Sequence, residues 1–191
     1  MKVEPIRNLK KIKALQNFLK QKSERDLLLL NFGLNTGLRI SDILKIKVSD
    51  IWTKRKHFKH YFILREVKTQ KEKRIKLNSA LKRYLTNFLK NTKLKYSDYL
   101  FQSRKMKDGK KKPITRVQAY RTLKISSEAL NIENFGTHSL RKTWGYWTYK
   151  KSKFNIALIM DMFNHSSQKI TLEYIGINQD QRDELYSIVQ F

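Results

Sequence analysis

The sequence contains no cysteine, and it has only two prolines and six glycines among its 191 residues. Without cysteine the chain can form neither a disulfide framework nor a thiolate metal site, and four histidines alone do not suggest structural zinc. No apolar run reaches the roughly 18–20 residues of a membrane-spanning helix, and the N-terminus lacks the apolar core of a signal peptide. These absences predict a cytoplasmic protein.

Acidic residues are scarce as well. Sixteen Asp and Glu against 42 Lys and Arg give a formal net charge of +26 at pH 7. Self-repulsion on this scale opposes compaction, so we expect a polyanionic partner, with nucleic acid as the first candidate and a membrane surface as the second. Hydrophobic residues make up 40% of the chain, which is enough for a core and excludes a disordered basic tail.

Hydrophobic periodicity predicts a mainly helical fold with a small antiparallel β-sheet. We expect helices over residues 6–20, 23–33, 41–46, 80–89 and 115–130, with others beginning near Ser139, Phe154, Gln168 and Gln179. Ser41 and Asp42 are expected to cap the third helix. Alternation from Phe58 to Leu77 predicts a β-hairpin whose turn lies in Thr69–Lys73, and a basic loop is expected over Ser103–Pro113.

Four places along the chain carry groups that could act on a phosphodiester. Arg39 stands just before a predicted helix N-terminus, where the helix dipole favours an anion. His138 and Arg141 are three residues apart and therefore share one helical face. His165 lies in a predicted turn, and Tyr174 follows nine residues later. Taken alone, residues of these kinds are more often solvated charges or packed rings, so the inference depends on their order and spacing.

The segments Thr-Gly-Leu-Arg-Ile-Ser-Asp at 36–42, His-Ser-Leu-Arg at 138–141 and Asn-His-Ser-Ser at 164–167, followed by Tyr174, resemble the tyrosine recombinase (phage integrase) signature. The likeness runs from Arg25 to Tyr174. It implies the integrase-type catalytic domain, and a site-specific recombinase that breaks and rejoins DNA through a 3′-phosphotyrosyl intermediate. One departure is Asn164, where the family usually has glycine. Because asparagine tolerates left-handed backbone angles, we expect the turn to survive.

The resemblance also implies a role for each residue of the signature. Tyr174 is expected to attack the scissile phosphate, with His138 as its general base. Arg39 and Arg141 are expected to clamp the non-bridging oxygens, because planar bidentate donors suit a phosphate better than point charges. His165 is expected to donate to a phosphate oxygen.

The leaving 5′-oxygen needs a proton, which the family takes from a lysine on a β-hairpin. Lys68 matches that place best, and Lys71 is the rival because a slip of register would exchange them. There is no carboxylate cluster to hold magnesium, and Asp42 is expected to act as a helix cap or to orient an arginine. We therefore expect neither metal nor cofactor.

Double-stranded DNA is the expected partner, rather than a membrane. The residues expected to contact its backbone are Arg104, Lys105, Lys107, Lys110, Lys111, Lys112, Thr115, Arg116 and Arg121. For the lysines of the basic loop, a merely solvated loop is an equally good explanation. We expect a monomer without DNA and a homotetramer on paired sites.

Residues 1–178 are expected to form the catalytic domain, and residues 179–191 a helical tail that is either exchanged between protomers or folded back on its own domain. About 24 residues precede the region of likeness, too few for the separate core-binding domain of longer family members. An accessory DNA-binding protein could replace that part of the clamp. A bacterium or its mobile element is the expected source.

Three other functions stay open on sequence grounds. The chain could be a catalytically silent DNA-binding factor with the same fold, or a type IB topoisomerase-like enzyme that relaxes one duplex. A basic RNA-binding or ribosomal protein would explain the charge but not the ordered residues.

Overall fold

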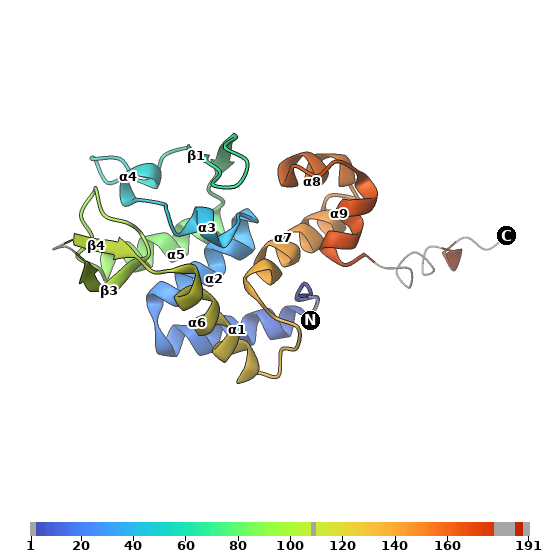
Figure 1. The fold of residues 1–191 in the computed structure, drawn as a ribbon, viewed down its shortest axis with the longest axis horizontal. Helices are drawn as coiled ribbons and strands as arrows, with labels where there is room; N and C mark the ends of the chain where they lie inside the picture. The colour runs from blue at the N-terminus through green and yellow to red at the C-terminus, as the bar shows by residue number, and fades with distance from the viewer. Residues whose placement is uncertain (1–2, 108–109, 178–185, 189–191) are drawn as a thin grey trace.

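The structure, a computed structural model, describes residues 3–107, 110–177 and 186–188 (Figure 1). Its elements are α1 (Leu9–Lys22), α2 (Glu24–Thr36), α3 (Ile40–Ile43), α4 (Val48–Ile51), β1 (Tyr61–Arg65), β2 (Glu72–Lys76), α5 (Ser79–Lys90), β3 (Gln102–Lys107), β4 (Lys110–Pro113), α6 (Arg116–Glu128), α7 (Thr137–Lys151), α8 (Ile156–Phe163) and α9 (Gln168–Ile175). The prediction of a mainly helical fold with small antiparallel sheets is confirmed. The helix expected near Gln179 falls outside the described residues.

Helix α2 lies at the centre of the larger hydrophobic core. Leu28, Leu29, Leu30 and Phe32 are each at most 1% exposed, and burying each of these side chains contributes about 1.5–3 kcal/mol to folding. Helix α7 crosses close to α2 at Gly33, where a Cβ would stand 2.7 Å from the Leu140 side chain. The two helices are thereby held together at the point from which the predicted site residues project.

A second, smaller hydrophobic cluster joins α7, α8 and α9, which lie together at one end of the molecule in Figure 1. Ile159, Phe163 and Ile175 are each at most 1% exposed. A Cβ at Gly145 would lie 2.6 Å from Ile175 and 2.9 Å from Phe163, so the three helices meet closely there. This packing fixes the direction of α9, the helix that carries Tyr174.

The predicted caps at Ser23 and Thr115 are confirmed, since each side chain accepts a backbone N–H of the helix that follows. The prediction that Ser41 and Asp42 cap a helix ending at Ile46 is wrong. Helix α3 begins at Ile40 and ends at Ile43, and Arg39 occupies its N-cap without a side-chain cap bond. The Asp42 carboxylate instead accepts the Val67 N–H at 2.8 Å, a tertiary contact that helix periodicity does not reveal.

Strands β1 and β2 form the predicted hairpin, but its turn lies earlier than expected. The antiparallel register pairs Tyr61 with Lys76 and Leu64 with Lys73, so the connection occupies residues 66–71. The strand begins at Tyr61 rather than Phe58, which bridges to Trp52 instead. The Asp42–Val67 bond ties the hairpin connection to α3.

The expected basic loop over Ser103–Pro113 is wrong, because this segment forms a second hairpin. Strand β3 pairs with β4 from Gln102 opposite Pro113 to Lys107 opposite Lys110. An Asp-Gly pair between two strands is a strong hairpin signal, and this sequence has one at 108–109. Those two residues themselves lie outside the described part of the chain.

No helix in the described part of the chain combines the length and the apolar character needed to cross a lipid bilayer.

Gly37 ends α2 in a left-handed conformation, with φ of +63° and no room for a side chain. An added Cβ would stand 2.4 Å from the Trp144 ring. We expect Gly37→Ala to lower the free energy of unfolding by roughly 2–4 kcal/mol, because left-handed backbone and overpacking each cost about 1–3 kcal/mol. Urea titration measures this loss. Gly136→Ala is the control, since its backbone is extended and its closest contact is Val3 at 3.2 Å. Equal losses in both variants would contradict the prediction.

Candidate active site

Tyr174 and His138 meet although they are 36 residues apart in the sequence. His138 lies in the first turn of α7, and its Nδ1 is 3.2 Å from the Tyr174 hydroxyl of α9. The Tyr174 ring packs edge-on against Phe163 and His165, with centroids 5.5 and 5.0 Å away. A phenol held beside an imidazole can transfer its proton, which is the first requirement for a tyrosine nucleophile.

Arg141 lies one helical turn after His138 on α7 and is only 3% exposed. It donates to the Gly37 carbonyl at 2.6 Å and to the Phe163 carbonyl at 3.2 Å. Its guanidinium carbon stands 4.0 Å from the Phe163 ring centre. These contacts orient the guanidinium, so Arg141 is a preorganised cation beside Tyr174.

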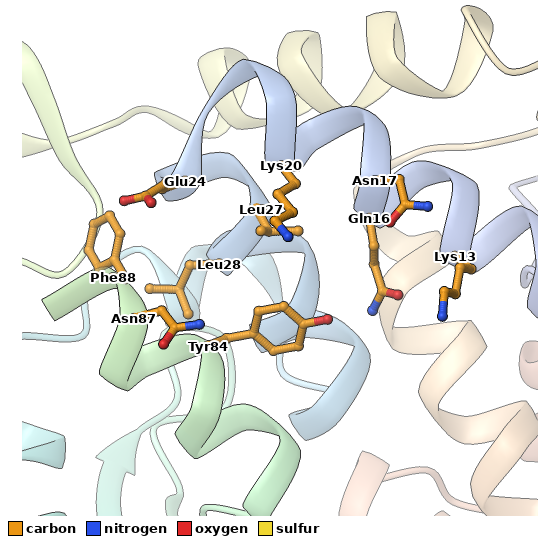
Figure 2. Close-up of a pocket in the computed structure, with 10 residues that line it drawn as sticks. All are labelled: Lys13, Gln16, Asn17, Lys20, Glu24, Leu27, Leu28, Tyr84, Asn87 and Phe88. Atoms are coloured by element: carbon orange, nitrogen blue, oxygen red, sulfur yellow. The ribbon is translucent and has the colours of Figure 1, made fainter. Parts of the chain in front are cut away.

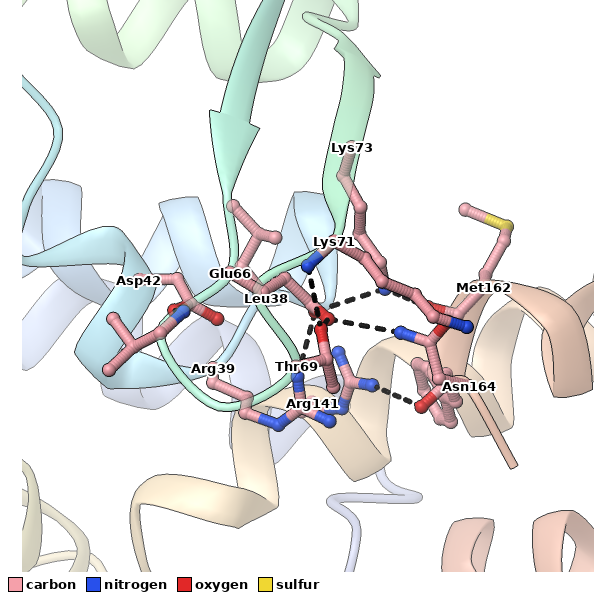
Figure 3. A network of polar contacts seen from close by, with 12 residues as sticks. Leu38, Arg39, Asp42, Glu66, Thr69, Lys71, Lys73, Arg141, Met162 and Asn164 are labelled. Atoms are coloured by element: carbon pink, nitrogen blue, oxygen red, sulfur yellow. Dashed lines mark hydrogen bonds and ion pairs between the residues drawn. The ribbon is translucent and has the colours of Figure 1, made fainter. Parts of the chain in front are cut away.

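Arg39 reaches the same region from the N-cap of α3 and binds Glu66, as Figure 3 shows. Its Nη1 donates to Glu66 Oε1 at 2.7 Å. The Glu66 carboxylate is fully buried and also accepts from Thr69 Oγ1 at 2.6 Å and from Asn164 Nδ2 at 3.0 Å. Lys73 completes the group, with its Nζ 3.0 Å from Glu66 Oε1. One carboxylate therefore gathers donors from α3, the β1–β2 hairpin and the end of α8.

His165 follows Asn164, which takes the left-handed conformation expected of it, with φ of 54° and ψ of 47°. The expectation that asparagine replaces glycine at this turn is confirmed. The Nδ1 of His165 lies 3.2 Å from the Thr171 hydroxyl, which in turn donates to the Ser167 carbonyl. This contact occupies one of the two ring nitrogens of His165.

The electrostatics of the site favour a neutral imidazole beside a neutral phenol. Burial raises the pKa of Tyr174, an effect that the nearby Arg141 and Arg39 partly oppose. Partial desolvation and the charges of Arg141 and Arg39 lower the pKa of His138 below its ordinary 6.5, and the same causes lower that of His165. At neutral pH His138 is therefore in the form that can accept the Tyr174 proton.

The pH dependence of DNA cleavage follows from this assignment. We expect the single-turnover rate to fall only below pH 6.5, as His138 becomes protonated, and to be flat from about pH 7 to 8.5. If free hydroxide rather than His138 removed the Tyr174 proton, the rate would instead rise about tenfold per pH unit. Cleavage rates measured from pH 5 to 9 decide this. His138→Gln, as control, should lose the plateau.

Lys68 and Lys71 both lie in the β1–β2 hairpin, as the sequence predicted. Lys68 and Lys71 are exposed in the β1–β2 connection, and the Lys68 side chain is not part of the cluster around Arg39. Lys73 of β2 belongs to that cluster, because it binds both Glu66 and the Met162 carbonyl. Burial, together with Arg141 and Arg39, lowers the pKa of Lys73 against the opposing effect of Glu66. The structure thus adds a third candidate for the proton donor.

Sequence reasoning missed both Glu66 and Lys73. Burial raises the pKa of Glu66, but hydrogen bonds from Thr69 and Lys73 and the charge of Arg39 bring it below its ordinary value, so the carboxylate is ionised. One signal was available, since Glu66 is the only acidic residue between Asp50 and Glu72. Nothing comparable distinguishes Lys73 from its neighbours in a lysine-rich strand.

The predicted DNA-contacting residues are described only in part. Lys111 and Lys112 are exposed on β4, and Arg116 and Arg121 are exposed on α6. Thr115 forms the N-cap of α6. The side chains of Arg104, Lys105, Lys107 and Lys110 fall outside the described part of the structure. The described members form an exposed basic surface on two consecutive elements.

A separate pocket between α1, α2 and α5 contains no predicted site residue (Figure 2). It is lined by Lys13, Gln16, Asn17, Lys20, Glu24, Leu27, Leu28, Tyr84, Asn87 and Phe88. Over the described ranges, no three His, Cys, Asp or Glu side chains gather closely enough to hold a metal ion.

Comparison with known proteins gives consistent relatives. The model of the phage integrase family matches residues 8–181. The probable integrase/recombinase YoeC of Bacillus subtilis (strain 168) is 40% identical over 186 residues, which cover 97% of this chain and 96% of that protein.

Among solved structures, the XerA recombinase has a TM-score of 0.74 at 16% identity, covering 99% of this chain and 66% of that one. The XerH site-specific recombinase bound to palindromic difH substrate has a TM-score of 0.69 at 18% identity, covering 98% of this chain and 54% of that one. The chain thus matches the fold over nearly its whole length but spans only half to two thirds of these longer proteins.

Proposed function

The chain belongs to the phage integrase family, and we propose that it is a site-specific recombinase that breaks and rejoins DNA through a 3′-phosphotyrosyl intermediate. The observation that carries this proposal is the contact between Tyr174 and His138 beside the buried guanidinium of Arg141. A silent DNA-binding factor has no need of a phenol positioned next to a neutral base and an ordered cation.

In the proposed reaction Tyr174 attacks the scissile phosphate while His138 accepts its proton. Phosphorus bonds to the phenol oxygen and releases the 5′-hydroxyl strand, so the bond energy is conserved for rejoining. Arg39 and Arg141 stabilise the charge on the non-bridging oxygens, and His165 donates to one of them. Proton return from His138 reverses the step.

We further propose that no metal or cofactor takes part, because the guanidinium groups of Arg39 and Arg141 supply the positive charge that a phosphoryl transition state needs. Lys68 remains our proposal for the acid that protonates the leaving 5′-oxygen, and Lys71 remains its rival. The pairing of Lys73 with Glu66 makes Lys73 a further candidate.

Double-stranded DNA is the proposed substrate, and the XerH relative was solved with a difH substrate bound. We propose that the basic surface of β4 and α6 contacts its phosphates, together with Arg104, Lys105, Lys107 and Lys110. We also propose a monomer without DNA and a homotetramer on paired sites. Residues 1–178 would form the catalytic domain, and 179–191 would pass to a neighbouring protomer or fold back. A cytoplasmic setting in a bacterium or its mobile element fits this activity.

Incubation with supercoiled plasmid tests the proposal before any target site is known. The reaction contains a chelator and no added metal, and it is stopped with detergent, with half of each sample treated with protease. We expect relaxed circles together with a detergent-stable protein–DNA adduct. Loss of both when the chelator is present would contradict metal independence. Native size analysis on DNA separates a synapsing tetramer from a monomeric, topoisomerase-like relaxing enzyme.

A further inference from the structure

The buried carboxylate of Glu66 occupies the place where the cationic residues of the site converge. It accepts hydrogen bonds or ion pairs from Arg39, Lys73, Thr69 and Asn164, all within 3.0 Å. Figure 3 shows the four donors pointing at it from different elements. Its exposed fraction is zero, so the carboxylate is closed off from bulk solvent.

The donors around Glu66 are of the kind that bind a phosphate. A guanidinium, an ammonium, a hydroxyl and an amide N–H all donate and carry no competing negative charge. Arg39 belongs to the segment whose proposed role is to clamp phosphate oxygens, and Asn164 directly precedes His165. The Glu66 carboxylate therefore occupies hydrogen-bond donors, Arg39 above all, that the proposed reaction needs for binding the DNA phosphate.

Asp42 provides a second observation. Its Oδ1 accepts the Val67 N–H, one residue after Glu66, but its buried Oδ2 has no hydrogen-bond partner among the described residues. A buried acceptor without a donor is costly. While Arg39 pairs with Glu66, this neighbouring carboxylate oxygen is available to another donor.

We propose that Glu66 is an internal stand-in for the scissile phosphate, holding Arg39, Lys73 and Asn164 in place until DNA displaces it. This inference rests on the proposed function. Glu66 is a positioning residue, and it lies two residues before Lys68 in the same hairpin connection. Displacement of the carboxylate by a phosphate would move that connection, so phosphate entry and movement of Lys68 would be a single event.

Glu66→Gln tests the proposal, with Glu72→Gln as the matched control. Both substitutions remove one negative charge from the same hairpin, but Glu72 is exposed and lies outside the cluster. The probe is inorganic phosphate, titrated by calorimetry and by the NMR signals of the arginine Nε–H groups. We expect Glu66→Gln to bind phosphate about tenfold more tightly than Glu72→Gln, equivalent to ~1.4 kcal/mol.

Equal phosphate affinity in the two variants would overturn the proposal, as would weaker binding by a folded Glu66→Gln. If that variant does not fold, Glu66→Asp withdraws the carboxylate from its donors by one methylene, and we expect a smaller gain of the same sign; no gain there also overturns the proposal. Phosphate binding needs no catalysis, whereas adduct formation by the unchanged chain on DNA tests the proposed function. A phosphate gain without any adduct would therefore reject the recombinase activity, and Glu66 would then be a stand-in for a bound phosphate but not for a scissile one.

Discussion

We expect that replacing Tyr174 with phenylalanine abolishes the covalent protein–DNA adduct while DNA affinity stays close to that of the unchanged chain. Only the hydroxyl is lost, and the edge-on packing of the ring against Phe163 and His165 is available to phenylalanine as well. Losing the contact with His138 should cost no more than about 1 kcal/mol of stability. Without the phenol oxygen no phosphotyrosyl bond can form, so the expected effect on cleavage is complete.

Adduct formation can be measured without a known target site by using a library of DNA duplexes with randomised sequences, each nicked near its centre. A short strand released beside the nick diffuses away and traps the adduct, which a denaturing gel then detects. Tyr149→Phe is the matched control, because Tyr149 also packs edge-on against an aromatic ring, that of Phe154. It should retain the adduct. An adduct in Tyr174→Phe, mapped to another tyrosine, would reject Tyr174 as the nucleophile.

Local signals in the sequence correctly predicted where several helices begin or end. Ser23 and Thr115 cap helices because their side chains satisfy N–H groups a few residues away, which is a local interaction. Asn164 ends α8 for an equally local reason, its tolerance of positive φ. The ordered signature also anticipated that His138 and Tyr174 meet, although only the resemblance, and no local rule, supplied that expectation.

The errors arose where contacts distant in sequence decide the structure. Asp42 was expected to cap a helix or to orient an arginine, but its carboxylate accepts a hydrogen bond from Val67, 25 residues away. The hairpin connection lies at 66–71 rather than at Thr69–Lys73, and this register brings Lys73 against Glu66. A single acidic residue in a hairpin connection shows no periodicity that would reveal complete burial, so the cluster around Glu66 could not be derived from the sequence.

The site lies where the two hydrophobic clusters join, and α7 belongs to both. Leu140 of α7 packs into the larger cluster, whereas Tyr146 of the same helix belongs to the smaller one. Arg141 ties the two together, because its guanidinium donates to Gly37 at the end of α2 and to Phe163 at the end of α8. Any rearrangement of α8 and α9 relative to α2 therefore changes the environment of Tyr174 and Arg141 together.

The second large effect on cleavage is expected from removing the general acid, the residue that protonates the leaving 5′-oxygen. We expect Lys68→Ala to slow cleavage of ordinary DNA by about 10²–10⁴-fold, because the departing 5′-oxygen would then leave as an alkoxide. A substrate with sulfur at that 5′ position needs no acid, since a thiol has a pKa near 8.5 and leaves readily as a thiolate. Lys68→Ala should therefore cleave the sulfur substrate at nearly the rate of the unchanged chain.

Lys73→Ala gives the contrasting result if Lys68 is the acid. Its loss removes an ion pair with Glu66 and a bond to the Met162 carbonyl, so it disturbs the site itself. Cleavage of both substrates should then fall by the same factor, and Lys71→Ala should change neither. Rescue by sulfur in Lys73→Ala but not in Lys68→Ala would instead identify Lys73 as the acid. In that case the β1–β2 hairpin would keep, during cleavage, the register that it has without DNA. The proton donor Lys73 already lies in the cluster around Glu66, which the scissile phosphate must enter.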